Sequence, residues 1–426
     1  MSRASPSETL PIHALGAHGD GVHQAERERI YVDRALPGDT VTATLREGDD
    51  GLWRGDLIEV LTPSPHRVPA PCPHYDVCGG CTMQHATAAF YQDWKVLLVR
   101  EALAKRDLTP RTWAPPVFLP AGGRRRVTFA ALKKGNVVTL GFNRRRSHQV
   151  TDVSACLIVD PVLMDLRARL ATLLVPVLKE GKAADVFIQI VNGQSDLVIT
   201  GPVGRSGTPD LAVHEAIGQL VHTARISRIA WRARKRETPE VMLESNPIIA
   251  RFGALAVPLP PLAFLQPTQA GEAALVAAVM ENLPEKGAFA DLFAGCGTFT
   301  GPMLTHGSVE AFESNPDAIR ALEKAMGMLP LRATGRDLFR NPVRADEAKR
   351  FDTIVFDPPR AGAQAQAKAL AASAVPLLIG VSCSPASFAR DARILVDGGY
   401  ALDSVKVVDQ FTWSHHVELV ATFRKN

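Results

Sequence analysis

Two residues in the last part of the chain have the chemistry of a nucleophile and a base. Cys383 lies in the sequence VSCSP, where the proline ends a predicted strand and should leave the sulfur exposed. Glu418 lies in a late apolar strand, where burying an acid is costly unless the side chain has a partner or a function. A thiolate can form a covalent intermediate and a carboxylate can accept a proton, so the pair suits covalent catalysis. The alternatives are a packed core thiol and an edge-strand glutamate that faces water.

A glycine-rich turn, DLFAGCGT, lies between a predicted strand and a predicted helix. Gly295 and Gly297 let the backbone approach a ligand closely. Glu313 ends the next strand, where an acid can accept hydrogen bonds from both hydroxyls of a ribose, and Asp337 follows a third short strand, where adenine contacts commonly lie. Thr300 stands where the dinucleotide fingerprint needs its third glycine, and the Walker lysine is absent. The other interpretation is an ordinary strand-to-helix turn.

The elements that must position these residues alternate between strand and helix. From residue 263 onward this alternation predicts an α/β fold with a parallel, doubly wound sheet, whose ligand sites lie at the carboxyl ends of strands. Asp357, in FDPPR, ends one such strand, and Cys383 ends the next. Short strands before a proline-rich stretch predict a small β-barrel, and hairpins such as the one around Asn192-Gly193 predict an antiparallel α+β module. We therefore expect three domains, at 1–62, 63–262 and 263–426.

The cysteines form a cluster of candidate metal ligands. Cys72, Cys78 and Cys81 have the spacing C-x5-C-x2-C, and Cys156 follows much later. Six cysteines in a long intracellular chain favour metal binding or catalysis over disulfides. Four thiolates can bind either zinc or an iron–sulfur cluster, and the spacing alone does not choose between them.

The charge is modest in total but clustered along the chain, with a formal net charge of +4. Arginines gather at Arg124, Arg125 and Arg126 and again at Arg144, Arg145 and Arg146. Such runs suit contacts with nucleic-acid phosphates, and the alternative is a solvated charged hairpin. A second basic run at 225–236 includes Trp231, an aromatic suited to unstacked bases.

Hydropathy predicts a cytoplasmic protein. The first ten residues lack the apolar core of a secretory signal, and no run reaches the roughly 18 apolar residues that a bilayer crossing needs. We expect a soluble monomer with no membrane partner.

The motifs DLFAGCGTF, FDPPR, VSCSP and HHVELV occur in this order, and together they resemble the RNA 5-methyluridine (uracil-C5) methyltransferases. The resemblance implies a class I, Rossmann-like methyltransferase domain that uses S-adenosylmethionine. It implies that Cys383 adds to carbon 6 of a uracil, which makes carbon 5 nucleophilic enough to take the methyl group, and that Glu418 accepts the carbon 5 proton. A base that meets Cys383 must leave its stack. The cofactor contacts implied by the motifs are Gln266, Phe293, Gly295, Gly297, Thr298, Glu313, Asp337 and Asp357.

Further features of the resemblance concern departures and neighbouring families. Gln266 belongs to a segment similar to the family's F-x-Q, but Thr268 and Thr298 stand where the family often has asparagine. Arg360 distinguishes the chain from RNA 5-methylcytosine enzymes, which have a second cysteine there, and from amino-group methyltransferases, which have an aromatic residue there.

The N-terminal part resembles the ribosomal RNA branch of the family. The sequence CGGC-x-x-QH resembles the family's cluster segment, which implies a [4Fe–4S] cluster, while GDG at 19–21 and ALPGD at 35–39 resemble a TRAM domain, an OB-like RNA-binding module. TRAM and cluster together imply 23S ribosomal RNA as the substrate. The alternatives are a transfer RNA uridine-5 methyltransferase and a non-catalytic RNA-binding or assembly protein on the same fold; a DNA or small-molecule methyltransferase is a weaker rival.

Overall fold

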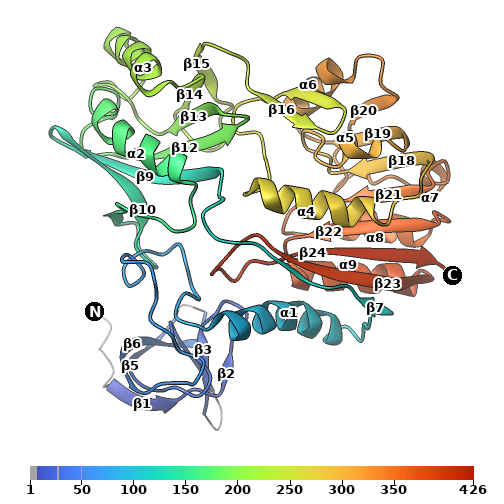
Figure 1. Ribbon diagram of the computed structural model, residues 1–426, viewed down its shortest axis with the longest axis horizontal. Helices are drawn as coiled ribbons and strands as arrows, with labels where there is room; N and C mark the ends of the chain where they lie inside the picture. The colour runs from blue at the N-terminus through green and yellow to red at the C-terminus, as the bar shows by residue number, and fades with distance from the viewer. Residues whose placement is uncertain (1–6, 26–27, 49) are drawn as a thin grey trace. The chain divides into compact units, whose positions relative to one another are not determined.

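The computed structural model describes residues 7–25, 28–48 and 50–426, which form two compact units (Figure 1). The first unit comprises the described residues up to Leu98, Arg144–Ser147 and Trp413–His416. The second comprises Val99–Asn143, His148–Thr412 and Val417–Asn426. Residues 1–6, which the expectation about a secretory signal includes, lie outside the described residues. Within the described ranges, none of the helices has both the length and the apolar character needed to cross a membrane.

The first unit contains an OB-like barrel built on a six-stranded sheet. Its order is β1-β5-β6-β4-β3-β2, and only β4 and β6 pair in parallel. The strands are β1 (Ser7–Pro11), β2 (Ala14–Leu15), β3 (Gly21–Gln24), β4 (Arg29–Val32), β5 (Thr40–Glu47) and β6 (Trp53–Thr62). Alternate residues of β5 are buried, and they pack with Leu10 and Val32 in a small core. Helix α1 (Ala88–Ala104) follows the three clustered cysteines along the chain.

A seven-stranded sheet opens the second unit. Its order is β11-β10-β9-β12-β13-β14-β15, antiparallel except between β13 and β14. The strands are β9 (Arg126–Lys134), β10 (Val137–Asn143), β11 (Val150–Asp152), β12 (Ala183–Val191), β13 (Gln194–Thr200), β14 (Arg228–Arg232) and β15 (Glu240–Glu244). The predicted turn at Asn192-Gly193 is confirmed, with φ of 50° and 80°, because both residues tolerate the left-handed region. Helices α2 (Pro161–Leu173) and α3 (Leu211–Ala224) pack on this sheet.

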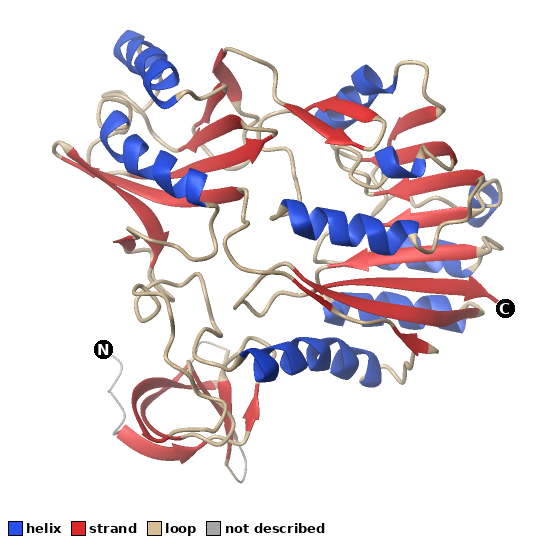
Figure 2. Ribbon diagram, viewed as in Figure 1, coloured by secondary structure: helices blue, strands red, loops and turns tan. Residues whose placement is uncertain are grey.

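The predicted doubly wound domain is confirmed as a nine-stranded sheet with helices on both faces (Figure 2). Its order is β20-β19-β18-β21-β22-β24-β23-β7, with β8 also on β23. The strands are β18 (Gly287–Leu292), β19 (Gly307–Glu313), β20 (Leu331–Gly335), β21 (Thr353–Phe356), β22 (Leu377–Ser382), β23 (Tyr400–Asp409) and β24 (Glu418–Lys425). Only β24 runs antiparallel to its neighbours.

The central strands of this sheet are apolar throughout because helices cover both of their faces. In β22, Ile379 packs with α4 (Gln269–Met280) and α6 (Pro316–Met326), whereas Leu378 packs with α8 (Gln364–Ala371) and α9 (Pro385–Asp397). The short helices are α5 (Thr300–Met303) and α7 (Ala345–Ala348). A separate hairpin, β16 (Ile249–Phe252) and β17 (Leu255–Pro258), packs against α5 and α6.

The last strands at one side of the nine-stranded sheet come from far upstream in the chain. Strands β7 (Thr112–Trp113) and β8 (Val117–Phe118) pair in parallel with β23. Both fall within the stretch 63–262, so residues from the expected middle domain complete the sheet of the expected catalytic domain. The three domain boundaries stay a prediction, because compactness divides the described residues into two units.

Candidate functional site

The residues with candidate chemistry gather at one edge of the nine-stranded sheet. Asp357 directly follows β21 and Cys383 directly follows β22, at the carboxyl ends of neighbouring parallel strands. Glu418 reaches the same edge from the opposite direction because it begins the antiparallel strand β24. Ser382 lies opposite Leu419 in the register. Cys383, which follows Ser382, and Glu418, which precedes Leu419, are therefore brought together. The antiparallel strand thus unites two residues that lie 35 positions apart.

The glycine loop after β18 has an open side and a packed side. Gly295 has a φ of 54°, its amide donates to Glu313 Oε2 at 3.0 Å, and a Cβ there would meet nothing within 4 Å. Gly297 has a φ of 97°, and a Cβ there would lie 2.9 Å from Leu322 of α6. Phe293 also has a positive φ, 63°, which is uncommon for a non-glycine residue. The loop therefore leaves room for a ligand at Gly295 and requires close packing at Gly297.

Two acids predicted to bind a nucleoside lie at the rim of this loop. Glu313 Oε1 accepts hydrogen bonds from the amides of Ser314 and Asn315, at 2.7 and 2.8 Å, which fixes the carboxylate beside the loop. Asp337 is partly exposed, and its carboxylate accepts from the amide of Phe339 at 3.0 Å. A carboxylate held in this way keeps free lone pairs for hydroxyl or amino groups. These residues fit the ribose and adenine of an adenosine cofactor.

An aromatic residue that the sequence reasoning missed lies beside this rim. Phe339 is 47% exposed, and its ring lies 5.5 Å, between centroids, from the ring of Phe293. Exposed aromatic faces suit stacking with a planar base. The available signal was its position two residues after Asp337 in the same loop. Thr298, another predicted contact, is partly buried in the glycine turn.

A buried carboxyl supports the loop from below. Asp291 is fully buried at the end of β18, and Thr300 Oγ1 donates to it at 2.5 Å. Burial raises the pKa of Asp291 to about 7. Asp357 is partly buried, and loss of solvation raises its pKa to about 7 as well.

The electrostatics of Cys383 and Glu418 are linked. Burial, then the carboxyls of Glu418 and Asp357, raise the pKa of the Cys383 thiol to about 11, while Arg360 opposes the shift. Burial raises the pKa of Glu418 to about 8, with a further increase from Asp357. Without RNA, the thiol and the carboxyl are therefore mostly protonated at neutral pH. Glu418 is only 4% exposed, so the alternative of an edge-strand glutamate facing water is wrong.

A pair of glutamines joins Glu418 to the F-x-Q segment. Gln266 is buried, and its Oε1 accepts a hydrogen bond from Gln410 Nε2 at 2.7 Å. The same nitrogen donates to Glu418 Oε1 at 3.4 Å. Thr268, where the family often has asparagine, caps helix α4 by accepting from the amide of Gly271 at 2.9 Å. That hydrogen bond gives the substituted position a local structural role.

The first arginine run has inward and outward members. Arg125 bonds to the carbonyl of Gln266 at 3.1 Å and pairs with Glu272 at 2.5 Å. Arg126 lies over the ring of Phe264, 4.4 Å from its centroid, and Phe264 is 56% exposed. Loss of solvation, followed by repulsion from Arg124 and Arg125, lowers the pKa of Arg126 to about 10, which is still cationic at neutral pH. The Arg126–Phe264 pair therefore presents an aromatic face with a neighbouring positive charge.

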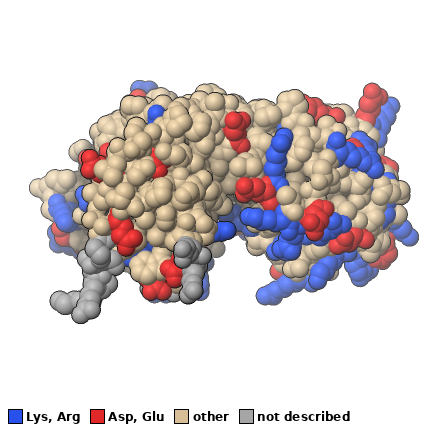
Figure 3. All heavy atoms as spheres, turned by 90° about the horizontal axis from the view of Figure 1, so that it is seen from below, with Lys and Arg blue, Asp and Glu red and all other residues tan. Residues whose placement is uncertain are grey.

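The second arginine run belongs to the first unit and is paired with acids from the barrel. Arg145 pairs with Asp33 and donates to the carbonyl of Cys81 at 2.6 Å. Arg146 lies within 3.8 Å of Asp56. The run contains no acidic residue of its own, but acids that are distant in sequence pair with its arginines. On the face drawn in Figure 3, basic side chains are likewise interspersed with acidic ones.

The prediction that residues 225–236 form a second basic surface is partly wrong. Arg228 is 3% exposed and forms a buried ion pair with Asp196 at 2.8 Å. Trp231 is partly buried, and its Nε1 donates to the carbonyl of Gly201 at 2.8 Å. A buried guanidinium requires a paired carboxylate, so Arg228 has a role inside the fold.

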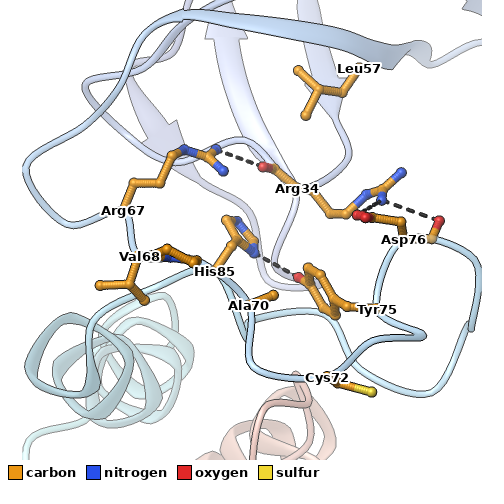
Figure 4. Close-up of a pocket in the computed structure, with 10 residues that line it drawn as sticks. Arg34, Leu57, Arg67, Val68, Ala70, Cys72, Tyr75, Asp76 and His85 are labelled. Carbon is orange, nitrogen blue, oxygen red and sulfur yellow. Dashed lines mark hydrogen bonds and ion pairs between the residues drawn. The ribbon is translucent and has the colours of Figure 1, made fainter.

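The cysteine loop borders a cavity of about 440 Å³ in the first unit (Figure 4). Gln84 Oε1 accepts from the amide of Cys72 at 3.1 Å. The hydroxyl of Tyr75 lies 2.6 Å from His85 Nδ1 and donates to the carbonyl of Thr82 at 2.8 Å. Burial lowers the pKa of His85 to about 3, so this imidazole is neutral at neutral pH. Gln84 and His85 therefore brace the loop that carries the cysteines.

The four predicted cluster ligands are free cysteines. None of the six cysteines forms a disulfide, and Cys72, Cys78, Cys81 and Cys156 are all partly exposed. Cys156 belongs to the second unit, unlike the other three. In the described part of the chain, no group of three or more Cys, His, Asp or Glu side chains is arranged to hold a metal ion. Four thiolates are suitable ligands for iron or zinc, so the chemistry of these side chains fits such a group.

Comparisons with known proteins agree with this fold and show the family. The family model described as tRNA (Uracil-5-)-methyltransferase matches residues 336–425. A protein of Caulobacter vibrioides named uncharacterized RNA methyltransferase is 38% identical, covering 98% of this chain and 100% of its own. The 23S rRNA (uracil(1939)-C(5))-methyltransferase RlmD of Bordetella pertussis is 31% identical, covering 98% of this chain and 93% of its own.

A solved structure shares the fold along nearly the whole chain. The Pyrococcus abyssi tRNA (uracil-54, C5)-methyltransferase, in complex with S-adenosyl-L-homocysteine, has a TM-score of 0.75 and 21% identity. The match covers 97% of this chain and 99% of that one. At this identity the likeness supports the architecture alone.

Proposed function

Because the chain belongs to the RNA uracil-C5 methyltransferase family, which uses S-adenosylmethionine, we propose that it methylates a uridine of 23S ribosomal RNA through a covalent adduct between Cys383 and carbon 6. The observation that carries the proposal is the meeting of Cys383 and Glu418 at one sheet edge, beside the glycine loop. A thiol and a carboxyl in that arrangement suit addition followed by proton removal. The ribosomal substrate rests on the relative of Bordetella pertussis.

The proposed reaction proceeds in three balanced steps. The Cys383 thiolate adds to carbon 6 of the uracil, and the electron pair of the C5=C6 bond moves onto the conjugated C4 carbonyl as an enolate. Carbon 5 then attacks the methyl carbon of S-adenosylmethionine, and the sulfonium sulfur leaves as S-adenosylhomocysteine. Glu418 accepts the carbon 5 proton, the C5=C6 bond reforms, and the sulfur departs as a thiolate. Burial raises the pKa of Cys383 to about 11, and we propose that RNA binding assists its ionisation, with Arg360 as a cation that opposes the shift.

We also propose cofactor contacts for the residues at the glycine loop. Glu313 accepts hydrogen bonds from the ribose hydroxyls, and Asp337 contacts the adenine. The adenine stacks against Phe339, next to Phe293. Gln266, Gly295, Gly297, Thr298 and Asp357 complete the set proposed to contact the cofactor or the base.

The test uses methyl transfer from labelled S-adenosylmethionine to unmodified ribosomal RNA, followed by digestion to nucleosides. We expect 5-methyluridine with wild type, and neither product nor adduct with Cys383→Ala. Cys296→Ala is the matched control, since its thiol is buried in the cofactor loop with a pKa raised to about 12. RNA containing 5-fluorouridine should trap the protein covalently, because fluorine at carbon 5 cannot be removed as a proton. Full activity of Cys383→Ala would contradict the covalent mechanism.

The same assay separates the two RNA substrates. Unmodified 23S ribosomal RNA should accept the methyl group, while transfer RNA should not. Activity on transfer RNA alone would favour the substrate named in the family description. Absence of transfer to both would favour a non-catalytic RNA-binding role.

We propose that the arginines contact RNA phosphates. The candidates are Arg124, Arg125, Arg126, Arg144, Arg145 and Arg146. The support is strongest for Arg126, whose cation lies on an exposed aromatic ring. Replacing a phosphate-contacting arginine reduces the salt dependence of binding by about one unit of slope. A salt titration of RNA binding by Arg126→Met measures this directly.

We further propose that Cys72, Cys78, Cys81 and Cys156 bind an iron–sulfur cluster, on the support of the likeness between the segment CGGC-x-x-QH and the cluster segment of the family. No catalytic step depends on this group. A brown protein absorbing near about 400 nm, with matching iron and sulfide content, is the expected result. A colourless protein that contains zinc would contradict the proposal.

A further inference from the structure

Gln410 is a buried polar side chain at the candidate site that the proposed mechanism does not use. It follows β23 directly and is 3% exposed. Its amide nitrogen lies 2.7 Å from Gln266 Oε1 and 3.4 Å from Glu418 Oε1, so its two hydrogens serve two acceptors. A primary amide has two hydrogens on one nitrogen, which matches this pair of contacts.

The backbone around Gln410 is held in place on both sides. The carbonyl of Asp409 accepts from the amide of Leu119 at 3.1 Å, and Thr412 Oγ1 donates to the carbonyl of Leu119 at 3.1 Å. The side chain is held as well, because a Cβ at Gly271 would stand 2.1 Å from Gln410 Oε1. Glycine at this position of α4 therefore provides the space that Gln410 occupies. Such fixed support is what a catalytic group requires from its neighbours.

We propose that Gln410 is a positioning residue for the catalytic base, which orients Glu418 by a hydrogen bond and keeps its carboxylate available to accept the carbon 5 proton. The inference rests on the proposed function of Glu418. A donor that points at a carboxylate stabilises the ionised form, because only a lone pair can accept its hydrogen. Gln266 holds the other hydrogen of the same amide and so fixes its direction.

The charges around Glu418 show why such a donor is needed. Burial and the carboxyl of Asp357 raise the pKa of Glu418, while the hydrogen bond from Gln410 opposes that shift, followed by Arg360 and Arg126. Cys383 faces the same carboxyl. Gln410 donates a hydrogen bond directly to the Glu418 carboxyl, whereas Arg360 and Arg126 lower the pKa of Glu418 through their charges. Losing it leaves less carboxylate at neutral pH.

The consequence is specific to one step of the reaction. Addition of Cys383 and methyl transfer come before proton removal, so weakening the base should leave them largely intact. The methylated adduct, with its carbon–sulfur bond at carbon 6, should then accumulate on ordinary uridine RNA. If the pKa of Glu418 rises by about one unit, the fraction present as carboxylate falls roughly tenfold at any pH below that pKa. A residue with only a structural role would slow all steps together.

The experiment compares Gln410→Met with wild type in single turnovers on unmodified 23S ribosomal RNA with S-adenosylmethionine. Adduct is followed on denaturing gels and 5-methyluridine after digestion, from pH 6 to 9. We expect roughly tenfold slower resolution of the adduct at pH 7, recovery as the pH rises, and unchanged trapping by 5-fluorouridine RNA. Gln366→Met is the matched control, because Gln366 is equally buried but bonds to the backbone of Val343.

A second variant keeps the inference testable if Gln410→Met fails to fold. Gly271→Ala places a methyl group against Gln410 Oε1, while alanine favours the helix in which it stands. It should also accumulate adduct. Equal slowing of adduct formation and resolution, or no accumulation in either folded variant, would overturn the role of Gln410. If wild type itself forms no adduct with 5-fluorouridine RNA, the proposed function fails instead, and the two results are distinct.

Discussion

The ionisation of Cys383 can be measured by its reaction with iodoacetamide as a function of pH. Its pKa is near 11, chiefly through burial and then through the carboxyls of Glu418 and Asp357. At pH 8 such a thiol is ionised in about one molecule in a thousand, against roughly one in ten for a thiol with an ordinary pKa of about 9. The thiolate fraction is therefore about a hundredfold smaller. A thiolate of higher pKa is more nucleophilic, which offsets about tenfold of this loss, so native Cys383 should react about ten times more slowly than the same residue in unfolded protein.

The assay follows the Cys383 peptide by mass spectrometry, in native protein and in urea. The native rate should increase about tenfold per pH unit between pH 7 and 10 without reaching a plateau. Glu418→Gln removes the second largest cause of the shift, so its Cys383 should react faster than that of wild type at the same pH. A native rate that levels off below pH 9 would refute the reasoning, because it would mean that the thiol ionises like an ordinary cysteine.

Three other predictions concern stability and cofactor binding. Burial raises the pKa of Asp291 to about 7. As the pH increases from 4 to 7 the unfolded state loses this proton first, so the contribution of Asp291 to stability falls. Thermal unfolding of Asp291→Asn should therefore depend less on pH than that of wild type. Gly301→Ala would place a Cβ 1.9 Å from the carbonyl of Phe252 and should lower the unfolding free energy by about 1–3 kcal/mol in urea, whereas Gly335→Ala meets nothing within 4 Å and should change it little. Arg336 bonds to the carbonyls of Asn341 and Pro342 and to Glu347, so Arg336→Ala should loosen the loop of Asp337 and weaken S-adenosylmethionine binding about tenfold by calorimetry; unchanged affinity would separate that loop from the cofactor site.

Much of the catalytic domain is predictable because its signals are local. Strand ends, glycine turns and helix caps depend on neighbouring residues, so the glycine loop, Glu313 and the strands leading to Asp357 and Cys383 are found where the sequence indicates. The Asn192-Gly193 hairpin was predicted on the same basis. Short-range patterns therefore place the strands and turns of the site.

The features that were missed depend on distant partners. Strands β7 and β8 are two residues each, too short to show a pattern, and they exist because β23 offers them an edge. Arg228 looks like a surface cation until Asp196 is placed beside it. Gln410 is one polar residue in a loop, and its role emerges only when Gln266 and Glu418 are seen around it. Contacts of this kind have no periodicity in the sequence.

The contacts of Arg125 have a thermodynamic consequence for how the two substrates bind. This residue immediately precedes β9, and it bonds to the carbonyl of Gln266, a proposed cofactor contact, and to Glu272 of helix α4. Its neighbours Arg124 and Arg126 are proposed to contact RNA. If RNA binding shifts this run, the affinity for S-adenosylmethionine changes by some factor, and linkage requires that S-adenosylmethionine change the affinity for RNA by the same factor. The order in which the two substrates arrive then has no influence on the stability of the ternary complex.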